Sequence, residues 1–266
     1  MKNLVFKRSN VFFSSCLLVV LHIPFVFAKA RPVAGLLLKP ASPHIEIVDP
    51  IVLKEKKMDS VVTILYDSLR LNSVGLAKEV FAYAYQGFAN LAEEGKLNNR
   101  RILSIVDFSK SSCKKRLYVI DFQRMKILFN TYVAHGLNSG EAFATRFSNS
   151  MESNQSSLGF YETADTYIGK NGYSLRLEGL EKGFNDNAYD REIVMHGADY
   201  VNEQLIRSRG YIGRSLGCPA VPTKLHKPII DKIKNGSCLF IFSPNQNYLT
   251  RSSILKQVSA PLLAYN

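Results

Sequence analysis

The hydrophobic pattern of the chain changes near residue 101, and this change constrains the fold more than any other feature. Before it, apolar residues recur at helical spacing, whereas after it they alternate with polar residues over short runs, as in half-buried β-strands. The first strands are joined by short connections, so we expect antiparallel neighbours. The chain is therefore expected to have a mainly β body within an α+β fold. The predicted strands are 102–108, 116–122, 126–134, 159–167, 175–177, 192–196 and 237–242.

Two helical segments precede the β body. Asp59-Ser60 is expected to cap the first helix and Ser73 the second, and a later helix is expected over 223–234. The second helix has an apolar stripe formed by Leu76, Val80, Ala84, Phe88 and Leu91. The expected domains are a signal peptide (1–28), an extended linker (29–57), an N-terminal helical subdomain (58–98), the β domain (99–250) and a C-terminal tail (251–266).

The first 28 residues have the pattern of an export signal. Basic residues precede an apolar run over 11–27, and cleavage is expected after Ala28, with Ala30 as the alternative. Because the run is short for a membrane span, an uncleaved anchor is a further alternative. No second long apolar run follows, so we expect an exported protein of the periplasm or cell envelope, without a membrane span after the signal.

The formal net charge of +12 limits the classes of partner. A basic exported chain suits an anionic surface such as the cell wall. A nucleic-acid partner is not expected, because export argues against it and no helix-turn-helix, zinc-finger or RNA-recognition pattern occurs. No close-spaced ligand pair or H-E-x-x-H pattern is present, so neither a metal nor another cofactor is expected. The sequence does not indicate the oligomeric state.

The cysteine count singles out a thiol. Removal of Cys16 with the signal leaves Cys113, Cys218 and Cys238, an odd number in an oxidising compartment. At least one is therefore free, paired between chains, or reactive. A Cys113–Cys238 disulfide would leave Cys218 as the free thiol, and the alternative for Cys238 is a small core residue.

Cys218 has the surroundings of a nucleophile. It lies in a turn with Gly213 and Gly217, and His196 ends a preceding strand. A reactive thiolate needs a base or a cation close to the sulfur. Glycines before the cysteine also let backbone N–H groups approach a substrate carbonyl as an oxyanion hole. A buried inert thiol is the alternative, which the turn residues disfavour.

The motifs around these residues resemble a known family. I-V-M-H-G-A (193–198) and G-R-S-L-G-C-P (213–219) resemble the signature of the YkuD-type murein L,D-transpeptidases, in a subgroup with S-x-G-C-P in place of S-H-G-C. Further segments that resemble this family include V-A-H-G-L-N-S-G (133–140) and R-E-I-V (191–194), and the resemblance covers roughly residues 60–250. It implies an L,D-transpeptidase-like β-sandwich or barrel that acts on peptidoglycan stem peptides.

The resemblance also implies roles for single residues. Cys218 matches the nucleophile and His196 the general base, whose imidazole the Gly197 carbonyl would orient. The N–H groups of Gly217 and Cys218 would stabilise the oxyanion. Ser215 opens the S-x-G-C turn, and we expect its hydroxyl to hold the turn rather than to react.

The chain departs from the family signature at Leu216, which stands where the second histidine is usual. We expect His135 to supply the lost imidazole, although a histidine with no part in the site is the alternative. Arg214 is expected to bind a substrate carboxylate, because a guanidinium can form two parallel hydrogen bonds with it. No function is expected for His44 or His226.

The implied reaction is a cysteine-dependent acyl transfer. A stem tetrapeptide would acylate the cysteine, and an amine acceptor would complete a 3→3 crosslink. Water as the acceptor would make the same site an L,D-carboxypeptidase or endopeptidase. A non-catalytic wall-binding protein on the same fold is a second alternative, which Leu216 keeps open. An unrelated papain-like protease is disfavoured, because no C-G-S-C-W context occurs.

Overall fold

A computed structural model of the chain describes residues 50–257, with side chains from Lys54 onward. These residues belong to one compact unit. The expected signal peptide, most of the expected linker and residues 258–266 of the expected tail lie outside the described residues. None of the helices between residues 50 and 257 has the length and apolarity needed to cross a bilayer.

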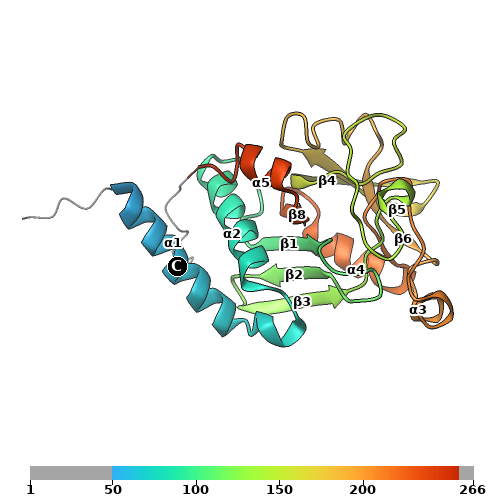
Figure 1. Cartoon of the computed structure of the whole chain (residues 1–266), viewed down its shortest axis with the longest axis horizontal. Helices are drawn as coiled ribbons and strands as arrows, with labels where there is room; N and C mark the ends of the chain where they lie inside the picture. Colours follow the sequence, from blue (N-terminus) through green and yellow to red (C-terminus); the bar gives the residue numbers. More distant parts are fainter. Residues whose placement is uncertain (1–49, 258–266) are drawn as a thin grey trace, which may run out of the picture. The chain divides into compact units, whose positions relative to one another are not determined.

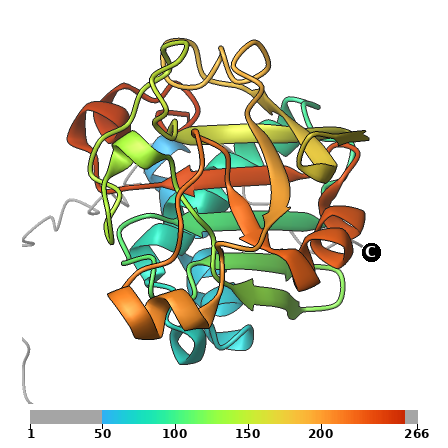
Figure 2. The same cartoon turned by 90° about the vertical axis from the view of Figure 1, so that its right-hand side faces the viewer.

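Eight strands form one mixed sheet in the order β3-β2-β1-β8-β4-β5-β6-β7. Figure 2 shows β4 in yellow, β8 in red and the green strands β1, β2 and β3 following one another across the sheet. The pairs β1–β2 and β2–β3 are antiparallel, as their short connections predict, whereas β1–β8 and β6–β7 are parallel. The mainly β body is thereby confirmed. The strands are β1 (Ile102–Asp107), β2 (Leu117–Asp121), β3 (Lys126–Thr131), β4 (Gly159–Gly169), β5 (Gly172–Gly179), β6 (Val194–Ala198), β7 (Ala220–Pro222) and β8 (Cys238–Phe242).

The N-terminal helices pack on this sheet. α1 (Pro50–Ser68) and α2 (Lys78–Glu93) are joined by the short helix η1 (Leu71–Val74), and both lie beside β1 to β3 in Figure 1. The predicted apolar stripe of α2 is buried in the same hydrophobic cluster as the strands. A Cβ on Gly87 would lie 2.0 Å from the ring of Phe160, so the α2 backbone sits directly on β4. The helices and the sheet therefore share one core.

Both helices begin elsewhere than expected. α1 begins at Pro50, so residues 50–57 are helical rather than an extended linker, and Asp59-Ser60 lies inside the helix. The fixed φ of proline suits the first helical position, which explains the earlier start. Ser73 does not cap α2, because it lies within η1.

The residues after β8 pack on the body, including the first described residues of the expected C-terminal tail. The buried carboxylate of Glu181 accepts hydrogen bonds from the hydroxyls of Tyr248 and Ser252 and, at 2.9 Å, from the Phe160 amide. These contacts hold α5 (Gln246–Arg251) and the residues that follow it. The short helix α3 (Glu203–Arg209) was also not expected, whereas α4 (Thr223–Ile233) confirms the helix predicted at 223–234.

The Cys113–Cys238 disulfide does not form, because Cys113, Cys218 and Cys238 are all free thiols. Cys238 pairs with Leu103 near the start of β1, whereas Cys113 follows the other end of that strand. A six-residue strand is about 20 Å long. A disulfide requires Cα atoms within about 7 Å, so the sheet itself separates these two cysteines.

Candidate active site

The pairing of β6 with β7 brings His196 and Cys218 together. In this parallel pair His196 is opposite Ala220, two residues after Cys218. Both residues line a cavity of about 860 Å³, which Arg214, Ser215 and Leu216 also line. The remaining wall comes from the β4–β5 hairpin, the segment that leads into β6, and Tyr200 after β6. Three positions predicted from two separate motifs, 196 from one and 214 and 218 from the other, thus meet at one cavity.

The Cys218 side chain is buried, and its thiol contacts the segment that leads into β6. Its sulfur accepts from the Val194 amide at 3.5 Å and donates to the Glu192 carbonyl at 3.6 Å. Burial raises the pKa of the Cys218 thiol, while the Val194 amide and the Arg191 cation act in the opposite direction. The pKa of the Cys218 thiol is therefore set by the balance between burial, which disfavours the thiolate, and the Val194 amide and Arg191, which favour it.

The imidazole of His196 is fixed by its own strand. Nδ1 lies 2.9 Å from the Gly197 carbonyl oxygen, the contact that the family resemblance implies. A carbonyl only accepts, so Nδ1 carries the proton and Nε2 is the basic nitrogen of the neutral ring. Burial, and secondly the neighbouring His226, lower the pKa of His196 and favour this neutral form. The thiol of Cys218 bonds to backbone groups rather than to this ring.

The turn before Cys218 is closed by Ser215. Its hydroxyl donates to the Cys218 carbonyl at 2.6 Å and accepts from the Gly217 amide at 3.1 Å. Gly217 has φ 129°, and a Cβ there would lie 2.9 Å from the Gln155 carbonyl oxygen, so only glycine fits. The expected oxyanion donor at Gly217 is thus corrected, because its N–H already serves the turn.

His135 does not enter the cavity, which corrects its expected role as the second imidazole. It is fully buried, with Nδ1 2.8 Å from Arg116 Nη2 and Nε2 3.2 Å from the Gly140 carbonyl oxygen. Burial, together with the Arg116 cation, lowers the pKa of His135 to about 4. Within residues 50–257 no three metal-ligating side chains are grouped to hold a metal ion.

The other two predicted positions near the cysteine do face the cavity. Arg214 is half-buried there and donates from Nη1 to the Gly140 carbonyl at 3.1 Å. Leu216, at the position of the usual second histidine, is 69% exposed on the cavity wall. The missing imidazole is therefore replaced by an apolar surface at this point.

Arg191 and Tyr200 are among the cavity residues that were not singled out from the sequence. Arg191 lies on the wall beside Cys218 and binds the polar segment before β4. Tyr200 packs on Gly213, where a Cβ would lie 2.4 Å from the tyrosine Cβ. Burial, and secondly the Cys218 charge, raise the pKa of Tyr200 to about 12. The R-E-I-V motif, which begins at Arg191, was the sequence signal that could have identified this residue. The spacing of the motif does not predict that the Arg191 side chain points toward the cysteine.

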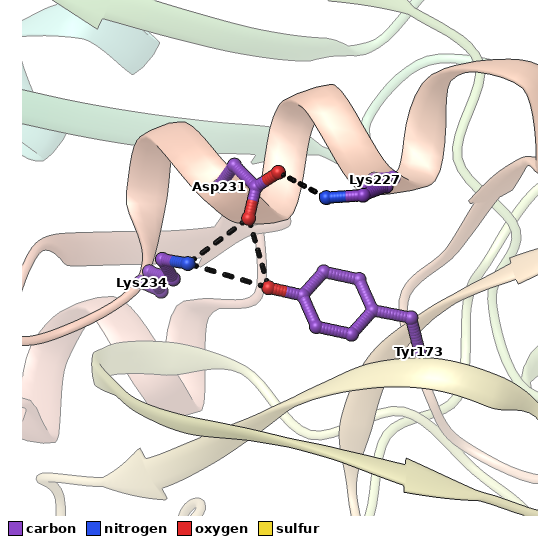
Figure 3. Close-up of polar contacts among 4 residues, drawn as sticks. All are labelled: Tyr173, Lys227, Asp231 and Lys234. Carbon is purple, nitrogen blue, oxygen red and sulfur yellow. Dashed lines mark hydrogen bonds and ion pairs between the residues drawn. The ribbon is translucent and has the colours of Figure 1, made fainter.

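His226, for which no function was expected, lies close to the site. A Cβ on Gly197 would lie 2.7 Å from its ring, so the imidazole rests on the backbone next to His196. Figure 3 shows how the rest of α4 is tied to β5: Asp231 pairs with Lys227 at 2.8 Å and with Lys234 at 3.0 Å, and accepts from the Tyr173 hydroxyl at 2.8 Å. His44 lies outside the described residues.

Comparisons with known proteins identify the family of the chain. The family model "L,D-transpeptidase catalytic domain" matches residues 72–242. The chain is similar to an L,D-transpeptidase from Mycobacterium smegmatis (12% identity, 54% of this chain and 59% of that one, TM-score 0.33). It is also similar to the helical cell shape determining protein Pgp2 (K307A mutant) from Campylobacter jejuni (12% identity, 60% and 57%, TM-score 0.35).

In both cases the chain spans less than two thirds of the length of the solved structure. No curated protein matches the sequence. The family model covers most of the described residues, including every cavity-lining position. The chain therefore belongs to the L,D-transpeptidase catalytic domain family.

Proposed function

We propose that this protein is a peptidoglycan L,D-transpeptidase with Cys218 as its nucleophile and His196 as its general base. The observation that carries the proposal is the β6–β7 pairing, which puts both side chains on the wall of one cavity. The family membership supplies the reaction class, and the N-terminal sequence pattern supports export to the cell envelope.

The first half-reaction would form a thioester. His196 Nε2 takes the proton of the Cys218 thiol, and the sulfur attacks the carbonyl carbon of the third residue of a stem tetrapeptide. The tetrahedral intermediate collapses by breaking the C–N bond to the terminal D-alanine. The imidazolium returns the proton to the leaving nitrogen, so D-alanine departs with a neutral amine and its carboxylate, and the acyl group stays on the sulfur.

The second half-reaction would regenerate the thiol. A side-chain amine of another stem peptide attacks the thioester carbonyl and gives its proton to His196. The C–S bond breaks as the new amide forms, and the sulfur recovers the proton. The Cys218 N–H would stabilise the oxyanion in both steps.

The charges of the cavity support a stem peptide as substrate. Its wall holds four cations, Lys170, Arg176, Arg191 and Arg214, and two acids, Asp190 and Glu192. A stem peptide brings several carboxylates, and guanidinium groups bind carboxylates through paired hydrogen bonds. Among the cations we assign the terminal carboxylate to Arg214, which is half-buried on the same wall as Cys218.

Covalent labelling tests the nucleophile. A carbapenem should add one adduct to the intact protein, and peptide mapping should place it on Cys218. The Cys218→Ser variant should stay unmodified while it remains folded by circular dichroism. A folded wild-type protein that gains no adduct would support the non-catalytic alternative and count against the proposal.

A further inference from the structure

Arg191 holds a cluster of hydrogen bonds that no other residue of the cavity matches. Its Nη1 donates to the Ser148 carbonyl and to the Ser157 hydroxyl, both at 2.8 Å. Its Nη2 donates to the Gln155 carbonyl at 2.7 Å and to the Ser153 hydroxyl at 3.2 Å. All four N–H bonds of the two terminal nitrogens are therefore used, and the guanidinium is fixed in one position.

None of these four partners is a carboxylate, so the positive charge of Arg191 is not neutralised by them. The side chain is half-buried, and burial lowers the pKa of Arg191 without removing its proton at neutral pH. A partly desolvated cation without an anion is costly for a fold. Such a charge is well placed to stabilise an anion that forms beside it.

The anion that can form there is the thiolate of Cys218. Its sulfur rests on the backbone of Glu192 and Val194, which directly follow Arg191. A Cβ on Gly217, the residue before the cysteine, would lie 3.4 Å from Arg191 Nη2. The Arg191 guanidinium is therefore adjacent to the turn that carries the Cys218 thiol.

Other charged and titratable groups also face this sulfur. Glu192 is exposed and opposes ionisation of the thiol, whereas Arg191 favours it. His196, Tyr200 and Arg214 share the cavity wall. Arg176 and Lys170 also lie on this wall, and Arg176 pairs with Asp165. Arg214 donates to the Gly140 carbonyl and lies over the ring of Tyr211, whereas Arg191 is fixed against the cysteine turn.

We propose that Arg191 is a positioning residue whose fixed charge stabilises the Cys218 thiolate, in place of the second imidazole that Leu216 removes. This inference rests on the proposed function, because it assigns the cation of the same nucleophile. Its second effect is mechanical: the segment 148–157 that it holds also contacts the cysteine turn, where Ser156 Oγ donates to the Gly217 carbonyl at 3.3 Å.

The test compares Arg191→Met with Arg191→Lys in the full chain. Both variants lose the planar fork that makes the four hydrogen bonds, but only lysine keeps the charge. The rate of alkylation by iodoacetamide, a neutral reagent, is followed against pH from the mass of the Cys218 peptide. We expect the midpoint for Arg191→Met to lie about one pH unit above that for Arg191→Lys, which is roughly a tenfold lower thiolate fraction at neutral pH.

Arg207→Met is the matched control, because Arg207 is 73% exposed on α3 and pairs with Glu203 away from the cavity. Its midpoint should equal that of the wild type. If the methionine variant does not fold, Arg191→Gln takes its place with the same expected shift. Coincident midpoints for the charged and uncharged variants would overturn the inference. Because alkylation needs no turnover, this result is separate from carbapenem labelling, which decides the proposed function.

Discussion

The chain contains two His-Gly dipeptides, His135-Gly136 and His196-Gly197, in opposite environments. His135 is enclosed between Arg116 and the Gly140 carbonyl, with no access to the cavity. His196 is held by the Gly197 carbonyl, and its ring lines the cavity with Cys218. The dipeptide alone therefore does not decide the role of a histidine. Its neighbours do, because the His135 ring is fully buried and held by Arg116, whereas the His196 ring lines the cavity.

The largest expected effect separates the two histidines by rate. His196→Gln should lower the rate of acyl transfer by about 10²- to 10⁴-fold, because the thiol loses its base. His135→Gln should keep the wild-type rate per folded molecule, since its ring does not reach the cavity. The measurement is the initial rate of crosslinked product at a temperature where both variants are folded. A similar loss of rate in both variants would end the distinction.

The next effect is on the pH dependence of stability. The pKa of His135 is about 4 in the folded chain and about 6.5 when unfolded. Between these pH values the unfolded chain binds the proton and the folded chain does not, so the free energy of unfolding rises with pH. The contribution of His135 to it is fully present above about pH 6.5. Falling pH should remove roughly 3 kcal/mol by pH 4.

Urea unfolding across this range measures that dependence. His135→Gln should show a shallower slope than the wild type, because the titrating ring is gone. Arg207→Met, at an exposed position of α3, serves as the control and should keep the steep slope. Equal slopes for the wild type and His135→Gln would show that His135 is not the buried neutral group described here.

A smaller effect concerns the bond between Arg116 and His135. His135→Leu removes the acceptor of a fully buried guanidinium and should lower the free energy of unfolding at neutral pH by about 2 kcal/mol. His135→Asn offers an oxygen in place of Nδ1 and should lose clearly less. An equal loss in the two variants would assign the effect to packing instead of to the hydrogen bond.

The smallest effect should come from His226, which contacts the backbone beside His196. Its charge contributes to lowering the pKa of His196. His226→Gln should therefore raise that pKa and move the acid limb of the pH–rate profile to higher pH, because protonated His196 cannot act as a base. Imidazole NMR signals of His196 measure the same shift directly. A limb that stays in place would limit His226 to packing.

Much of the fold could be predicted because its signals are local. The positions of β1, β2 and β8 and the apolar stripe of α2 follow from neighbouring residues, and the structure confirms them. The expected half-burial of these three strands is wrong, because all of their residues are buried. Features that depend on distant partners could not. The environment of His135 depends on Arg116, which directly precedes β2. The packing of α5 depends on Glu181, which follows β5.

The candidate site divides in the same way. Cys218 and His196 were found from motifs, and strand pairing places them at one cavity. The Gly217 amide was expected to stabilise the oxyanion. Instead, it donates its hydrogen bond to the Ser215 hydroxyl in the same turn. The direction of the Arg191 side chain depends on the segment 148–157, which has no periodic pattern.

The most direct test of the account is the mass of the products formed from peptidoglycan. Disaccharide tetrapeptides incubated with the wild-type protein should yield D-alanine and 3→3 crosslinked dimers, and Cys218→Ser should yield neither. Tripeptides without dimers would identify water as the acceptor and correct the proposed transfer. The account is contradicted if the folded wild-type protein leaves the substrate unchanged, or if Cys218→Ser forms the same products.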